Sequence, residues 1–130
     1  MSLTSQLAAL ANRVATEIKT LVRPEHPGIA RAWVTFGYIG GAIQIGASHN
    51  VSGVTRLATG RYRITFAVPL PDANYCWTAL ARSSTNSGTQ RVAIVRSSTD
   101  LKTAQYVDIS CATTSASFDD SSEINLTVFR

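Results

Sequence analysis

The amino-acid sequence predicts a mainly β protein, in which an N-terminal coiled-coil helix precedes an antiparallel β-sandwich or barrel of about seven or eight strands. The chain has 130 residues, which is the size of one domain. Hydrophobic residues make up 45% of it and charged residues only 15%, whereas a disordered chain has low hydrophobicity and high charge. Ser and Thr together supply 29 residues, and their preferences for loops and strands favour a β protein.

Residues 1–22 have the pattern of an amphipathic helix. Ser2 can cap its N-terminus, and Pro24 stops it within a Pro-rich linker at residues 23–29. Six apolar side chains recur at spacings of three and four residues, which places them on one face. They are Leu3, Leu7, Leu10, Val14, Ile18 and Leu21. We predict that this stripe is an oligomerisation surface for more than two chains, because it is wider than a two-position seam; the alternative is packing against the chain's own domain.

Residues 30–130 change to the alternation of period two that is typical of β-strands. The segments that carry this pattern are 30–36, 42–47, 51–57, 61–68, 74–82, 91–96, 104–111 and 123–130. The alternation predicts inward side chains at Ala32, Val34, Phe36, Tyr62, Ile64, Phe66, Val68, Ile124, Leu126 and Val128. Turn signals such as Gly40-Gly41 and Thr59-Gly60 separate the segments. Short strands at this regular spacing predict an antiparallel sandwich or barrel.

The charge and the cysteines limit the classes of partner. The net charge of +4 arises from 12 basic and 8 acidic residues, and the arginines are scattered along the chain. A nucleic-acid-binding protein normally has a denser basic stripe, so we expect no nucleic-acid partner. No stretch of 18 apolar residues is present, so we expect no membrane insertion. Cys76 and Cys111 fit no metal-binding spacing and are expected to be buried free thiols, with a disulfide as the alternative.

Few residues suggest catalysis or metal binding, and we expect neither an enzyme nor a cofactor. His26 lies in the linker, and His49 lies at a strand end or a tight turn. Asp119, Asp120 and Glu123 form the only acidic cluster, which we expect to be a solvated turn, with cation binding as an alternative. A glycan hydrolase would need a pair of carboxylates. Those available are Asp108, Asp119, Asp120 and Glu123.

Aromatic side chains offer two interpretations, a packed core or a carbohydrate-binding platform. The residues concerned are Trp33, Tyr38, Tyr62, Tyr75, Trp77 and Tyr106. Aromatic residues at strand spacing usually pack in the core, and we expect this of Trp33 in particular. Exposed loops are expected at residues 83–90 and 113–122, and recognition residues are commonly found on such loops. The predicted recognition surface consists of Tyr38, Arg82, Asn86, Asp119 and Asp120.

One part of the sequence resembles a known family. The run AWVTF, followed by AIQIGASHNVSGVT and then by TGRYRITFAVPLPDANY, resembles a segment of tailed-bacteriophage tail-fibre and related virion proteins. The resemblance covers roughly residues 30–82, and residues 83–130 match only in their style of strands and loops. The order of the elements is specific as a whole, although no single piece of it is.

The resemblance implies a homotrimeric fibre or knob, in which a β-rich domain is held on a helical stem. Most members are not enzymes, and they often bind the host surface. Because fibre proteins are usually longer than this chain, we expect a short trimeric fibre, an adaptor or a decoration on the tail or capsid. Its location would be the virion, assembled in the bacterial host cytoplasm, and its partners would be copies of itself, other virion proteins and a host-surface glycan. The alternative is a lectin-like carbohydrate-binding module that is not tied to a virion.

Overall fold

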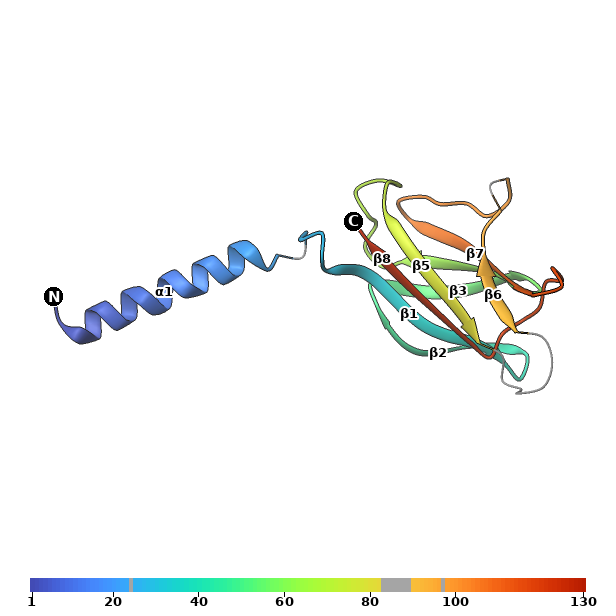
Figure 1. The fold of residues 1–130 in the computed structure, drawn as a ribbon, viewed down its shortest axis with the longest axis horizontal. Coiled ribbons are helices and arrows are strands. Elements are labelled where there is room, and N and C mark those ends of the chain that lie inside the picture. Colours follow the sequence, from blue (N-terminus) through green and yellow to red (C-terminus); the bar gives the residue numbers. More distant parts are fainter. Residues whose placement is uncertain (24, 83–89, 97) are drawn as a thin grey trace.

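The computed structural model describes residues 1–23, 25–82, 90–96 and 98–130. The described residues form one helix, α1 (Leu3–Leu21), followed by two four-stranded antiparallel sheets (Figure 1). The strands are β1 (Ala30–Ile39), β2 (Ala42–His49), β3 (Val51–Ala58), β4 (Arg61–Phe66), β5 (Cys76–Arg82), β6 (Arg91–Ile94), β7 (Tyr106–Thr113) and β8 (Glu123–Phe129). The mainly β prediction is confirmed, and the boundaries of the predicted strands differ from the observed ones by a few residues.

The strands are divided between two separate sheets, so the fold is a sandwich and not a closed barrel. Sheet A has the order β2-β1-β8-β5, and sheet B has the order β3-β4-β7-β6. The predicted turn at Gly40-Gly41 connects β1 to β2 in sheet A, with φ angles of 61° and 82°. Asn50 connects β2 to β3 and so carries the chain from sheet A to sheet B; its φ of 52° is in the left-handed region, which Asn tolerates better than most residues.

The core lies between the inner faces of the two sheets. Sheet A supplies buried residues from β1 and β8, and sheet B supplies them from β4 and β7. The rings of Phe36 in sheet A and Tyr62 in sheet B meet edge to face, with 5.3 Å between their centres. The inward positions predicted on β1, β4 and β8 are all buried. Burial of each Val, Leu, Ile or Phe side chain among them contributes about 1.5–3 kcal/mol to the stability of the fold.

Two of the predicted core positions are wrong. Val68 is 67% exposed, because β4 ends at Phe66 and the chain then turns away, with the Val68 amide donating to the Asn50 side chain. Trp33 is 39% exposed, because the alternation that buries Ala32 and Val34 places Trp33 on the outer face of sheet A.

The N-terminal helix projects away from the sandwich (Figure 1). Ser2 caps it as predicted, since its side chain accepts a hydrogen bond from the Ser5 amide at 3.2 Å. At the other end, the Val22 amide donates to the Ile18 carbonyl, and Pro24, which was expected to stop the helix, lies outside the described residues. No residue of α1 is buried, so the helix does not pack on the β domain of its own chain.

Candidate functional site

A continuous apolar stripe on α1 is exposed to solvent. All six predicted members lie on it, with exposed fractions between 47% for Val14 and 71% for Leu3. The other members are Leu7, Leu10, Ile18 and Leu21. Polar side chains lie elsewhere around the helix, including an Arg13–Glu17 ion pair one turn apart. An exposed apolar surface of this extent normally marks an interaction site.

The stripe is also the part of the chain that gains most from a partner. Most helical stability in proteins comes from packing of an apolar face, and none of the residues of α1 is buried in the single chain. Burial of a Leu, Ile or Val side chain contributes about 1.5–3 kcal/mol. Complete burial of six such side chains would be worth on the order of 10 kcal/mol per chain, before the entropy cost of association is subtracted.

The predicted acidic turn is organised around Asp120, whose side chain is only 19% exposed. Arg56 donates to both carboxylate oxygens, from Nε at 3.0 Å and from Nη2 at 2.7 Å. The Tyr62 hydroxyl and the Gly60 amide donate to Oδ1 at 2.6 and 2.9 Å. Burial by itself raises the pKa of Asp120, but these hydrogen bonds outweigh it and lower the pKa to about 2. The prediction of a solvated turn is therefore wrong for Asp120.

Ser121 connects other members of the predicted recognition surface to this turn. Its carbonyl accepts a hydrogen bond from the Tyr38 amide at 2.9 Å, and its hydroxyl donates to the Arg82 carbonyl. The structure thus brings Tyr38, Arg82, Asp119 and Asp120 to one end of the sandwich. This end lies away from α1, because the helix joins the opposite end of β1 (Figure 1).

The remaining acidic side chains of this end are also paired with arginines. Asp119 pairs with Arg91 at 2.5 Å, and Glu123 pairs with Arg82. The fifth predicted recognition residue, Asn86, lies outside the described residues, as does the rest of the segment 83–89. The residues that sequence reasoning missed here are Arg56, Tyr62 and Arg91, because each lies far along the chain from the acidic cluster that it binds.

Two further carboxylates lie nearly buried, one in β7 of sheet B and one in the segment that precedes it. Asp108 is 1% exposed and accepts from Arg63 at 2.8 and 2.9 Å. Asp100, which sequence reasoning missed, is also 1% exposed and accepts from the Ser110 hydroxyl at 3.0 Å and the Arg96 amide at 2.8 Å. Burial raises the pKa of Asp100, but its hydrogen bonds lower it by more. All four carboxylates considered for a glycan hydrolase are therefore in ion pairs with arginines.

The aromatic side chains divide between the core and its margins. Tyr62 and Tyr75 are buried, which confirms the core interpretation for both. Tyr38 is half-buried and packs against the core, and the Arg56 guanidinium lies 4.5 Å from its ring centre. Trp77 is half-buried at the edge of the sandwich, where it lines a cavity of about 320 Å³.

The histidines and cysteines are separated from these clusters. His26 accepts a hydrogen bond from the Gly28 amide through Nδ1, and His49 is exposed at the end of β2. Both cysteines are free; Cys111 is buried as predicted, and burial raises the pKa of its thiol to about 12. Cys76 is exposed, so the prediction of a buried thiol is wrong there, because Cys76 begins β5 with its side chain outward. Within the described ranges, no group of three or more His, Cys, Asp or Glu side chains could hold a metal ion.

Comparisons with known proteins do not extend this description. No protein-family model, curated protein or solved structure matches the chain. In the part of the chain that the structure describes, no helix combines the length and the apolar character needed to cross a membrane.

Proposed function

We propose that this chain is a non-enzymatic structural protein of a bacteriophage virion, which forms a short homotrimeric fibre, an adaptor or a decoration on the tail or capsid. The observation that carries the proposal is the apolar stripe of α1, which is exposed along its whole length on a helix that projects from the β-sandwich (Figure 1). Three copies of α1 would form a coiled coil that buries these stripes against one another.

The width of the stripe favours three chains over two. Leu3 and Leu10 occupy one heptad position, and Leu7, Val14 and Leu21 occupy the other. Ile18 widens the apolar face beyond these two positions and is 56% exposed in the single chain. The resemblance of residues 30–82 to trimeric tail-fibre proteins supports the same number.

In such a trimer, the loop ends of the sandwiches would face away from the coiled coil. The end that carries the acidic turn lies at the far end of β1 from α1, so three copies would present three such ends together (Figure 1). Three weak contacts on one particle gain strength through effective concentration, which suits attachment to a host surface. The environment of Asp120 supports a non-enzymatic role, because its hydrogen bonds lower its pKa to about 2, whereas a glycosidase acid needs a raised pKa.

The oligomeric state tests this proposal. Light scattering after size exclusion should give three times the 13.9 kDa of one chain for the unmodified protein. Leu10→Asp places a charge in the stripe and should yield monomers, whereas Asn12→Asp adds the same charge on the opposite side of the helix and should leave the trimer intact. A monomeric or dimeric unmodified protein would overturn the trimer.

A lectin-like carbohydrate-binding module that is not tied to a virion is the second candidate. It is favoured by the cavity of about 320 Å³ in which Trp77 lies together with Lys102, since saccharide sites combine an aromatic face with polar groups. A monomeric protein that binds glycans in an array, and loses that binding in Trp77→Ala but not in Trp33→Ala, would favour this module over the fibre.

A further inference from the structure

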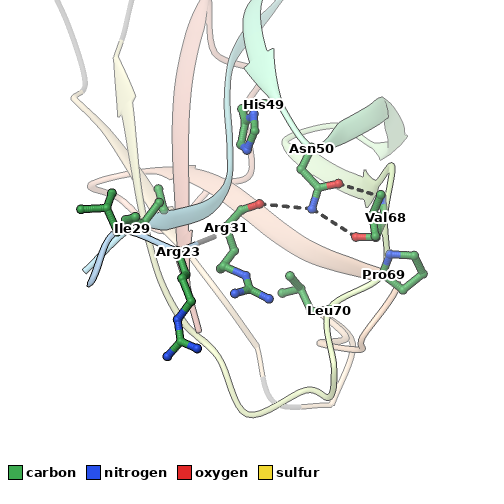
Figure 2. A pocket seen from close by; sticks show the side chains of 10 residues that line it. Arg23, Ile29, Arg31, His49, Asn50, Val68, Pro69 and Leu70 are labelled. Atoms are coloured by element: carbon green, nitrogen blue, oxygen red, sulfur yellow. Dashed lines mark hydrogen bonds between the residues drawn. The ribbon is translucent and has the colours of Figure 1, made fainter. Parts of the chain in front are cut away.

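A larger cavity, of about 640 Å³, lies where the end of the helical segment meets the β-sandwich. Residues 22–23 and 29–31 form one side of it, residues 49–50 form the corner between the sheets, and residues 68–70 form the other side (Figure 2). This volume is within the range of about 300–1,000 Å³ that is typical of small-molecule sites. The cavity is built from a single chain and lies at the opposite end of β1 from the acidic turn.

The Asn50 side chain joins two walls of this cavity. Its Nδ2 donates to the carbonyls of Arg31 and Val68, each at 3.1 Å, and its Oδ1 accepts from the Val68 amide at 2.7 Å (Figure 2). These three hydrogen bonds connect β1 to the segment that follows β4. The part of the cavity between Arg31 and Val68 is therefore formed before any ligand arrives, which reduces the entropy cost of binding.

The chemistry of the lining is cationic and apolar. Arg23 and Arg31 both line the cavity, and in Figure 2 their side chains extend in the same general direction. His49 lies above them at the end of β2. Val68 and Leu70 provide an apolar wall, and none of the described lining residues is Asp or Glu.

We propose that this cavity binds an anionic sugar, with its carboxylate or phosphate against Arg23 and Arg31 and its ring against Val68 and Leu70. A guanidinium group binds either anion through paired hydrogen bonds, and the C–H face of a sugar ring suits an apolar wall. The inference rests on the proposed attachment function and adds to it a ligand site at the helix end of each sandwich, separate from the loop end that carries the acidic turn.

The smaller cavity beside Trp77 is a poorer site for such a ligand. Its lining includes two carboxylates, Asp100 and Asp108, and two cations, Arg96 and Lys102, so it has no excess of positive charge to attract an anion. An anionic sugar is therefore expected to bind in the cavity lined by Arg23 and Arg31. A neutral sugar should bind weakly in that cavity, because it has no charge for the arginines to pair with.

The test is a titration of the full-length protein, followed by the amide chemical shifts in NMR spectra. Galacturonate should shift the amides of residues 29–31, 49–50, 68 and 70, and galactose at the same concentration should not. Glucose 6-phosphate distinguishes a phosphate from a carboxylate as the preferred anion, and binding of either one supports the site. Equal binding of galactose, binding of inorganic phosphate as strong as that of both sugars, or shifts confined to other residues would overturn the proposal.

Three matched variants locate the site. Arg23→Gln and Arg31→Gln should each weaken galacturonate binding about tenfold, since hydrogen bonds between charged groups are strong. Arg13→Gln removes an exposed arginine of α1 that lies outside the cavity and should leave the affinity unchanged. The comparison of galacturonate with galactose on the unmodified protein tests the preference for an anionic sugar even if a variant does not fold. A trimer that binds no anionic sugar contradicts this inference alone, whereas a monomer that binds one contradicts the trimer alone.

Discussion

Arg56 and Asp120 lie 64 residues apart in the sequence and form a two-point ion pair, with N–O distances of 3.0 and 2.7 Å. The pair joins β3 to the segment that leads into β8, and so links sheet B to sheet A at the loop end of the sandwich. Tyr62 adds a third donor from the core, because its ring packs on Phe36 while its hydroxyl reaches Asp120. The shape of this end therefore depends on one carboxylate.

Replacement of this carboxylate should destabilise the protein. In Asp120→Asn the amide loses the charge that Arg56 and Tyr62 bind, so we expect the free energy of unfolding to fall by about 2 kcal/mol. Urea denaturation measures the change. Asp119→Asn is the matched control, since Asp119 is 45% exposed and its pair with Arg91 should contribute less than about 1 kcal/mol. Equal losses in the two variants would contradict the special role of Asp120.

The same carboxylate makes stability depend on pH in acid. The pKa of Asp120 is lowered from 3.8 to about 2 in the folded state, so its contribution is present above pH 4 and is lost as the pH falls towards 2. The loss should amount to about 2 kcal/mol for this group. Urea denaturation at several pH values between 5 and 2 gives the free energy of unfolding at each pH. This free energy should fall less steeply with decreasing pH in Asp120→Asn than in the unmodified protein. An identical dependence on pH in the two proteins would contradict the lowered pKa of Asp120 in the folded state.

Gly37 should be intolerant of any side chain. A Cβ atom there would lie 2.0 Å from the Ser122 carbonyl oxygen, which is backbone and cannot move without displacing the turn. We expect Gly37→Ala to lower the free energy of unfolding by on the order of 3 kcal/mol. Gly53→Ala is the control, because a Cβ at this other strand position would meet nothing within 4 Å. Thermal unfolding of the two variants would separate them, and a stable Gly37→Ala would mean that the turn packs differently against β1.

The features that the sequence predicts well are those that each strand carries by itself. Ile124, Leu126 and Val128 are buried as their alternation predicts. The buried face of a strand can be read from the alternation along that strand alone, whichever strands lie beside it. The same rule, applied strictly to Ala32 and Val34, places Trp33 outside. The general preference of Trp for protein cores predicts the opposite and is wrong for Trp33.

The features that it does not predict depend on contacts between distant segments. Val68 continues the alternation of β4, but β4 ends at Phe66, and the Val68 amide donates its hydrogen bond to the Asn50 side chain. The environment of Asp120 depends on the order of strands in the two sheets, which places Arg56 and Gly60 beside it. The cavity lined by Arg23 and Arg31 likewise requires the corner at Asn50, and neither arginine lies in a recognisable motif.

The two thiols should differ sharply in reactivity. Cys76 is exposed at the start of β5, whereas Cys111 is fully buried in β7 and has a pKa raised by burial to about 12. Since the thiolate is the reactive form, a maleimide at pH 7 should modify one cysteine per folded chain and two per unfolded chain, as counted by mass spectrometry. Cys76→Ser should abolish labelling of the folded protein, and Cys111→Ser should leave it unchanged. Labelling of both thiols in the folded protein would mean that the core around Cys111 opens on the timescale of the reaction.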